Sequence, residues 1–502
     1  MRIPKPPLDN ALSPCILASL KTRLLPWLFP ALCGFFVSVF LPSCSQLSPP
    51  SRMTEADLEV PGSWQSVKEA RAGVDSDWVS HFKDSKLRAL VDEALLNNRD
   101  LRAAAARLDQ ARQQARIAGA AGLPTSDLTF AGNRQQQNFI GFPIGGGAND
   151  PNAVFSNTFN QFNLSLGVNW EADIWGRIRA GKSAATADTE AAAQDIRAAQ
   201  ASLAAQITST WFTLAESREQ VALATESEAI FQKTADAVRE RFLRGQQEDG
   251  GAAAQLRLTE SDAATARAAK VERQQTLESS ARQLEILLGR YPAGQIAAAK
   301  LPALPGKVPV GLPSELLQRR PDVLSAERRF AASGKRLSEA RRAVFPRLAL
   351  TSSSGTNTGD LSELLNSDFG VWQLAGNVVQ PILTGGQLRA EAAVRYAKEK
   401  EALADLQQTV LKAFGEVENA LAAERLLAQR ATAIDSATDL ARQADEAARA
   451  DYAGGVSDLL TVLTAQTRLV QLRSQQLTLR RLRLENRVNL HLALGGDFAP
   501  KS

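Results

Sequence analysis

The feature that most constrains this chain is an internal repeat of about half its length. The stretch Leu95–Asn133 aligns without a gap on a stretch 222 positions later, so that Pro124 falls on Pro346. In each copy, apolar residues at helical spacing continue up to the proline, and the pattern then changes to the alternation of a strand. Solenoid repeats are much shorter, about 20–50 residues. The chain is therefore expected to form one architecture from two homologous halves.

Each half also contains one helical run that is too long for an ordinary globular core. The patterns predict long helices over 176–241 and 386–452, with apolar residues seven positions apart as in a coiled coil. At 1.5 Å per residue, such a helix is about 100 Å long. A shorter helix is expected on either side, for example over 83–120 and 252–288 in the first half. Each half is thus expected to consist of a pair of strands with helices attached at one end.

Short stretches between these helices alternate between apolar and polar residues. The clearest is LSLGVNWE, in which Leu164 and Trp170 point to one side and Glu171 to the other. A period of two suits a half-buried sheet, and it equally suits a membrane barrel with lipid outside and water inside. The alternation alone leaves both open. Strand hairpins are expected at about 126–172 and 347–381.

Charge, cysteine content and histidine content exclude several classes of function. The net charge is +4, but residues 1–43 supply three of these charges, so nothing favours a nucleic-acid partner. All three cysteines lie within the first 44 residues, which excludes disulfide frameworks and cysteine-based metal sites in the rest. His81 and His491 belong to no metal or hydrolase motif, and His491 is expected to be a packed or capping residue. Glu416 and Glu418 are two apart on a helix and cannot form a carboxylate pair. No catalytic or metal-binding residue is predicted.

The first 43 residues have the pattern of an export signal. Lys21 and Arg23 precede an apolar run that ends at Cys44. The run approaches the length of a transmembrane helix, but its two prolines and the small residue before the cysteine favour cleavage. LPSC resembles a bacterial lipobox, which implies that Cys44 becomes an N-terminus carrying N-palmitoyl and S-diacylglycerol groups. Ser45, rather than an aspartate, implies sorting to the outer membrane.

Longer motifs resemble those of the TolC-like outer-membrane efflux channels, in the lipoprotein branch that serves resistance-nodulation-division pumps. The resemblance covers essentially everything after the signal, and it rests on GLPSELLQRRPDVLSAERR, QPILTGGQLRAEAA, YAGGVSDLLTVLTAQTRL and NWEADIWGRIRAGKSAA. It implies a homotrimer in which each chain gives four strands to one twelve-stranded outer-membrane barrel and helical hairpins to a periplasmic α-barrel. The expected fold class is thus mainly α with a small membrane β-barrel.

The resemblance also implies roles for single residues. Leucines and Trp170 of the stretch 164–171 would face lipid, and Asn169 would face the lumen. Pro124 and Pro346 would mark the crossing from α-barrel to β-barrel. Tip residues that match the family motif are Tyr452, Gly455 and Ser457.

The acidic residues of the tip are less conventional. The aspartates of the best-known channels would fall here on Thr461 and Thr464. Asp458, together with Glu248 and Asp249 in the other turn, is the candidate for an acidic gate ring. The alternative is that these carboxylates are solvated charges of ordinary turns.

The function that the resemblance implies is a passive duct without catalytic residues or cofactors. It would export drugs, toxic compounds or metal ions, and its partners would be outer-membrane lipid, a periplasmic adaptor and an inner-membrane pump that supplies the energy. Two alternatives are a type I secretion outlet of the same fold and a periplasmic coiled-coil scaffold or adaptor. The lipobox favours efflux over secretion, and the alternating strands favour a channel over a scaffold.

These expectations divide the chain as follows. The signal takes 1–43, a lipid-anchored tether 44–80, the first repeat 81–292, a linker 293–312, the second repeat 313–495 and a tail 496–502. Within the repeats, tip turns are expected at 245–251 and 454–457, and the last helix at 458–494.

Overall fold

The structure is a computed structural model that describes residues 60–66, 77–139, 155–244, 252–298, 300–306 and 310–496. These residues all belong to one compact unit, Arg52–Ser502. The predicted signal, the predicted lipidation site Cys44 and the predicted tip residues Glu248 and Asp249 lie outside the described residues.

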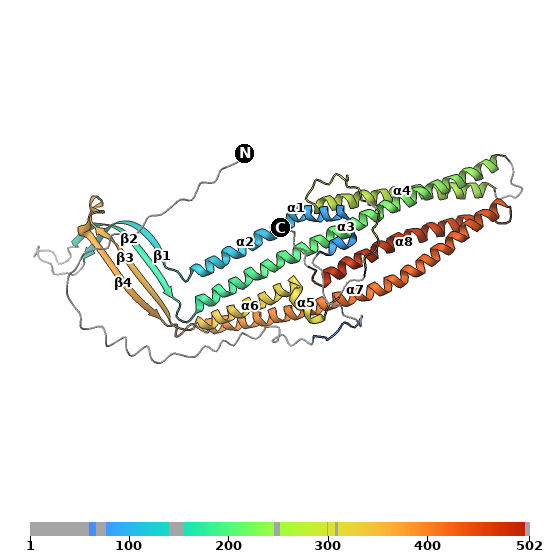
Figure 1. Cartoon of the computed structure of the whole chain (residues 1–502). Coiled ribbons are helices and arrows are strands. Elements are labelled where there is room, and N and C mark those ends of the chain that lie inside the picture. The colour runs from blue at the N-terminus through green and yellow to red at the C-terminus, as the bar shows by residue number, and fades with distance from the viewer. Residues whose placement is uncertain are drawn as a thin grey trace, which may run out of the picture. The chain divides into compact units, whose positions relative to one another are not determined.

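Helices make up most of the described chain. In each half, two helices precede the strands and two follow them (Figure 1). The first half contains α1 (Ser85–Asn97), α2 (Arg99–Ala120), α3 (Arg177–Leu243) and α4 (Ala252–Leu287), and the second contains α5 (Pro313–Arg319), α6 (Pro321–Arg342), α7 (Gln387–Ala453) and α8 (Leu459–Ala493). Short 3-10 turns are η2 (Trp78–Phe82), η3 (Leu361–Glu363) and η4 (Ser367–Phe369). Among the described residues, no helix is both long and apolar enough to cross a membrane.

The four strands form one antiparallel sheet in the order β1-β2-β3-β4. They span β1 (Thr125–Phe139), β2 (Phe155–Ala172), β3 (Arg347–Thr358) and β4 (Gly370–Val379). Each long helix follows a strand hairpin, α3 after β2 and α7 after β4, and both long helices contain 67 residues. The sheet therefore lies at one end of the helices, and the last residues of α3 and α7 and the first residues of α4 and α8 lie at the other (Figure 1).

The helix predicted over 83–120 is divided in the structure, and that prediction was wrong. Asn98 separates α1 from α2, because its backbone is extended instead of helical. Its side chain accepts hydrogen bonds from Asp100 N at 2.8 Å and Leu101 N at 3.1 Å. An asparagine in this position is a strong N-cap. The same break occurs 222 positions later at Arg320, where Pro321 begins α6. The repeat thus extends to the kinks.

The helices lie side by side in a single layer. α3 contacts α2 and α4 on one side and α6 and α8 on the other, and the main helix contacts of α7 are with α6 and α8. The layer order is therefore α2 with α4, then α3, then α6 with α8, then α7. This order follows that of the strands to which the helices connect, so that helices and sheet continue one wall.

Each half has its own hydrophobic core where its helices meet. The first is centred on Trp211, Phe212 and Leu284, and the second on Val323 and Leu406. All five of these side chains are fully buried. Two short segments before α1 each contribute a tryptophan to one of these cores: Trp78 packs into the first core and Trp64 into the second.

Candidate functional site

The sheet has one apolar side and one polar side over its whole width. Residues that pair across antiparallel strands point to the same side. The register places Leu128 opposite Leu166, Leu166 opposite Ser354, and Ser354 opposite Trp372. The side that these residues share also carries Phe130, Phe162, Leu164, Val168, Trp170, Leu348, Leu350, Leu374 and Val378.

The opposite side is mostly polar or small. Asn169 pairs with Thr351, and Gln373 lies opposite Ser353. Residues on this side include Asp127, Thr129, Asn133, Gln161, Asn163, Ser165, Glu171, Asn357 and Asn377. The contrast is clearest in β2 and β4. On the apolar side, β3 contributes Leu348 and Leu350 and then Ser352, Ser354 and Thr356, and the other side also carries Phe159, Val371 and Val379.

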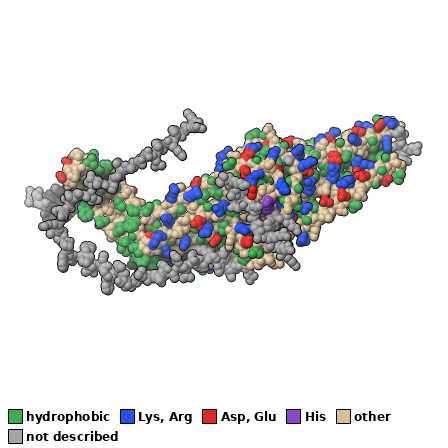
Figure 2. Space-filling model, in the orientation of Figure 1, with side chains coloured by type: hydrophobic (Ala, Val, Ile, Leu, Met, Phe, Trp, Pro, Cys, Tyr) green, Lys and Arg blue, Asp and Glu red, His purple; other side chains and the backbone are tan. Residues whose placement is uncertain are grey.

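The apolar side is uncovered. Trp372 is 81% exposed, Leu374 75% and Leu128 73%, and among the described helices only the short η4 has more than slight contact with the sheet, against β3. Figure 2 shows hydrophobic side chains gathered over the strands and at their junction with the helices. An uncovered apolar surface of this extent marks a membrane or protein contact. These exposures favour the lipid-facing interpretation over the half-buried sheet.

Aromatic residues bound the apolar stretch of β2. Trp170 and Phe162 lie on the apolar side eight residues apart, which is about 26 Å along the strand at about 3.3 Å per residue. Strands of membrane barrels tilt by about 35–45°, so the two rings would be about 20 Å apart along the membrane normal, somewhat less than the apolar band of about 25 Å between two aromatic girdles.

Both edges of the wall are open. β1 and β4 each have one neighbour in the sheet, and the helical layer likewise ends at α2 with α4 on one side and at α7 on the other. A sheet edge of this length presents a row of unpaired backbone groups. The described chain is thus a segment of a wall that needs further strands to close.

The crossing from helix to strand lies at the two predicted prolines. Pro124 stands between α2 and β1, and Pro346 between α6 and β3. Two tryptophan side chains form hydrogen bonds to the backbone where helix changes to strand. Trp170 Nε1 donates to Gly122 O at 3.1 Å, and Trp175 Nε1 donates to Pro346 O at 2.8 Å.

On the return path, glycine begins both long helices. Gly176 precedes α3 with φ of 75°, and Gly386 precedes α7 with φ of 83°. Few other residues adopt this left-handed conformation without strain. The second position carries the Gly385-Gly386 pair, which the structure shows to be a strand-to-helix turn.

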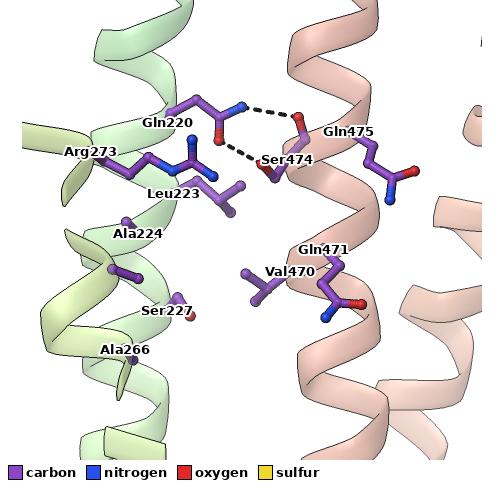
Figure 3. Close-up of a pocket in the computed structure, with 11 residues that line it drawn as sticks. Gln220, Leu223, Ala224, Ser227, Ala266, Arg273, Val470, Gln471, Ser474 and Gln475 are labelled. Atoms are coloured by element: carbon purple, nitrogen blue, oxygen red, sulfur yellow. Dashed lines mark hydrogen bonds between the residues drawn. The ribbon is translucent and has the colours of Figure 1, made fainter. Parts of the chain in front are cut away.

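Polar contacts join α3 to α8 about two-thirds of the way along α3 towards the tip. Gln220 Nε2 donates to Ser474 O at 3.0 Å, and Ser474 Oγ donates to Gln220 Oε1 at 2.9 Å (Figure 3). Arg473 forms two hydrogen bonds with Glu226, at 2.8 and 2.9 Å. These bonds hold the pKa of Glu226 below its usual value. The seam between the two helical hairpins is thus fastened along its middle.

At the tip, a hydrophobic cluster that includes Val238 of α3 and Leu459 of α8 joins the two hairpins, and one polar contact lies beside it. Arg241 Nη1 of α3 donates to Tyr452 Oη of α7 at 2.8 Å, and the guanidinium lies 4.8 Å from the centre of the tyrosine ring. The motif residue Tyr452 therefore has a partner 211 positions away, which the sequence did not indicate. A cation on an aromatic face together with a hydrogen bond makes this a specific but breakable link.

The remaining tip residues shape the turn into α8. Gly455 takes φ of 75°, and Val456 N donates to Asp451 O at 2.9 Å. Asp458, a candidate for the acidic ring, is the N-cap of α8 and accepts from Thr461 Oγ1 at 2.6 Å and Thr461 N at 2.8 Å. These hydrogen bonds, the hydroxyl first, hold its pKa below the usual value. Ser457 lies in the same turn.

The described residues contain no group of three or more side chains that could hold a metal ion. The two histidines contact each other, with ring centres 5.5 Å apart, and His491 is 1% exposed and stacks on Trp78. His491 is therefore a packed residue. Glu416 and Glu418 have different partners, Arg320 for the first and the backbone of Gln65 and Ser66 for the second.

Comparisons with known proteins agree with this geometry. The sequence model of the outer membrane efflux protein family matches residues 90–290 and 312–496. The pyoverdine export outer membrane protein OpmQ of Pseudomonas putida is 29% identical over 491 residues, covering 94% of this chain and 98% of its own. Outer membrane protein OprJ of Pseudomonas aeruginosa is 32% identical over 420 residues, covering 81% and 84%. The solved outer-membrane channel OprN superimposes with a TM-score of 0.77 at 25% identity, over 88% of this chain and 98% of its own.

Proposed function

The chain belongs to the outer membrane efflux protein family, and on this basis we propose that it is the outer-membrane channel of a tripartite efflux pump. It is a passive duct through which small molecules leave the cell envelope. Its relatives are named as outer-membrane and export proteins. Members of the family are channel proteins, and no step of the proposed function needs a catalytic residue.

The observation that carries the proposal is the two-sided, uncovered sheet with open edges. Four strands cannot close a barrel. Eight strands, from two copies, enclose only enough space for side chains, whereas larger barrels leave an aqueous channel. Twelve strands from three copies are thus the smallest closed number that supplies a duct. We therefore propose a homotrimer.

Closure of this trimer follows from the wall order. The free edge of β1 pairs with the free edge of β4 in the next copy, and α7 packs beside α2 and α4 of that copy. The side with Trp372 and Leu374 then faces lipid, and the side with Asn169 and Gln373 faces the water-filled lumen. The helices continue the lumen into the periplasm.

A lipid anchor at Cys44 is part of the proposal and rests on the lipobox sequence. Mass spectrometry of the mature protein tests it. The expected result is an N-terminal peptide that begins at Cys44 and carries one N-acyl and one diacylglycerol group. A Cys44→Ala variant should lose both groups, and a wild-type protein without lipid would exclude the anchor.

The partners are proposed to be a periplasmic adaptor and an inner-membrane resistance-nodulation-division pump. A relative named as a probable efflux pump outer membrane protein supports this, because a passive duct needs a partner that supplies energy. The end of α3, the start of α4 and the turn at 454–457 form the tip that the partners would meet. Adaptor contact would open the tip by breaking the link between Arg241 and Tyr452.

The alternatives differ in how much the structure favours them. A periplasmic scaffold has no use for an uncovered apolar sheet side, which disfavours that function. A type I secretion outlet would share the whole wall and differ only in partner and cargo. Copurification of the adaptor and pump from native membranes distinguishes that outlet from an efflux channel.

Conductance in planar lipid bilayers tests the duct. We expect the purified protein to run as a trimer in mild detergent and to conduct weakly. A variant with Arg241→Gln and Tyr452→Phe should conduct more, because the link at the tip is then absent. A monomer that never conducts, with or without these substitutions, would rule out the proposed function.

A further inference from the structure

A cavity of about 320 Å³ lies at the tip between α3 on one side and α7 with α8 on the other. Its floor is apolar, formed by Val238, Leu459 and Val462, which are 1%, 4% and 4% exposed. The volume is at the lower end of the range for small-molecule sites, about 300–1,000 Å³. The proposed channel function gives this cavity no role.

The rim of the cavity is cationic. Lys233, Arg241 and Arg449 line it, and no carboxylate does. Arg241 bonds to the neutral Tyr452, and Arg449 pairs with Asp445 at 2.8 Å outside the lining. Within the described part of the chain, Lys233 has no ion-pair partner. Positive charge in a concave, partly apolar space attracts anions.

A buried amide with no partner also lines the cavity. Gln466 is 4% exposed, and its Oε1 has no hydrogen-bond partner. Leaving a buried polar group unpaired costs about 1–3 kcal/mol, so a ligand that pairs with it gains affinity. The amide can be turned to present either its oxygen or its nitrogen. It can therefore donate to an anion as well as accept from a donor.

We propose that this cavity binds a small carboxylate carried on an apolar stem. The carboxylate contacts Lys233 and the amide of Gln466, and the stem lies over Val238, Leu459 and Val462. Such a ligand bridges α3 to α8 next to the link between Arg241 and Tyr452. It therefore holds the tip closed and lowers conductance. The binding stands on the cavity alone, and only its effect on conductance rests on the proposed channel function.

Three probes with the same tail test the binding. Isothermal titration calorimetry of the detergent-solubilised full chain would compare 4-phenylbutyrate, 4-phenylbutan-1-ol and 4-phenylbutylamine. We expect the carboxylate to bind at least about tenfold more tightly than the alcohol, with no binding of the amine. Its affinity should fall as salt is added, because the rim is solvent-exposed. Equal affinities for the three probes would overturn the proposal.

Variants locate the site. Lys233→Gln should weaken phenylbutyrate binding about tenfold and leave the alcohol unchanged. Gln466→Leu, which keeps the volume and removes the amide, should also weaken the carboxylate. Arg239→Gln is the control, because Arg239 is a nearby α3 cation that pairs with Glu260 at 2.8 Å and does not line the cavity. An equal loss in Arg239→Gln would show that the anion binds elsewhere.

Conductance separates the two parts of the proposal. Phenylbutyrate should lower the conductance of the wild type in planar bilayers and have no effect on Lys233→Gln. If phenylbutyrate binds but leaves a conducting wild type unchanged, the effect on the tip is refuted. If it binds to a protein that conducts in no variant, the channel function fails and the site stands.

Discussion

Asn98 and Arg320 occupy equivalent places in the two halves and make equivalent contacts with different chemistry. Asn98 Nδ2 donates to Leu287 O at 2.9 Å, at the end of α4, and Arg320 Nη1 donates to Ala493 O at 3.1 Å, at the end of α8. The last carbonyls of a helix have no partner within it. Each kink between the first two helices is thus tied to the end of the last helix of its half.

Removal of Arg320 should destabilise the protein more than removal of Asn98. The Arg320 side chain is 9% exposed and also pairs with Asp322 and Glu416, both at 2.6 Å. Arg320→Met leaves a buried carbonyl unpaired, at about 1–3 kcal/mol, and it also unpairs two carboxylates that are 41% and 56% exposed, at up to about 1 kcal/mol each. Asn98→Ala should cost about 1–3 kcal/mol. Chemical denaturation followed by circular dichroism measures both. Arg319→Gln, next in sequence but in an exposed pair, should change stability by less than about 1 kcal/mol.

The same close approach between each kink and the end of a helix explains why two further positions are glycines. Gly289 and Gly495 follow α4 and α8 with φ of 74° and 72°. A Cβ at Gly289 would lie 2.7 Å from Asn97 O, and one at Gly495 would lie 3.1 Å from the carbonyl carbon of Arg319. Alanine at either position should therefore lower the free energy of unfolding by about 1–3 kcal/mol.

Gly415→Ala is the matched control for these substitutions. Gly415 lies within α7 with open space around its Cα, so alanine should stabilise by about 0.5–1 kcal/mol. If all three alanine variants shifted the denaturation midpoint in the same direction, the close approach of each glycine to its kink would be irrelevant to stability.

Glu285 makes the end of α4 sensitive to acid. Burial by itself would raise the pKa of this carboxyl, but backbone N–H groups of Gly294 at 2.6 Å and Gln295 at 2.8 Å outweigh burial and lower it. A lowered pKa in the folded state means that the stabilisation is present above the ordinary value of 4.5 and is lost as pH falls below it. Unfolding free energy measured against pH should therefore fall in that range, and Glu285→Gln should flatten this part of the curve.

Much of this fold could be predicted from local pattern. Pro124 and Pro346 end their helices because proline lacks the N–H that a helix needs, and the change of period beside them predicts the strands. The two 67-residue helices follow from uninterrupted helical spacing. The break at Asn98 could not be predicted in this way, because asparagine is only mildly unfavourable within a helix. A hydrogen bond from Asn98 to the carbonyl of Leu287, 189 positions away, stabilises the break.

At the tip, too, local pattern predicts some features and not others. Tyr452, Gly455 and Ser457 were found by motif, but the partner of Tyr452 is Arg241, one of many arginines on an amphipathic helix. No local signal distinguishes it. Asp458, a gate candidate by its place in the turn, also caps α8, as an aspartate directly before the apolar start of a helix indicates. Its role in a gate stays a prediction. Contacts between distant segments are the part that the sequence left hidden.

The link between Arg241 and Tyr452 should set how often the tip opens. Tyr452→Phe keeps the ring and removes the hydroxyl that accepts from Arg241 at 2.8 Å. A hydrogen bond to a charged group contributes about 1.5–3 kcal/mol, so the open fraction in planar bilayers should rise about tenfold or more. Tyr396→Phe is the control, because Tyr396 lies near the other end of α7 and contacts only a lysine of its own helix, Lys400. An unchanged open fraction in Tyr452→Phe would remove this link from gating.

Glu418 should hold the segment before α1 against the second half. Its two carboxylate oxygens accept from Gln65 N at 2.7 Å and from Ser66 N at 3.0 Å. Beside them, the Trp64 ring is 3% exposed, lies 6.1 Å from the ring of Phe414 and donates from Nε1 to Gly311 O at 3.1 Å. The carboxylate and the indole thus fix this segment to α7 from two sides.

Glu418→Gln leaves one acceptor oxygen for two donors and removes the charge that strengthens both bonds. The bonds to a charged acceptor contribute about 1.5–3 kcal/mol, so amide hydrogen exchange in a peptide covering 60–66 should become about ten- to a hundredfold faster. Trp64→Ala should have at least as large an effect, because it removes the hydrogen bond of the indole and leaves a cavity in the core. Glu401→Gln, an exposed carboxylate on the same helix, should leave exchange unchanged. Exchange that stays slow in Glu418→Gln would show that the indole alone holds the segment in place.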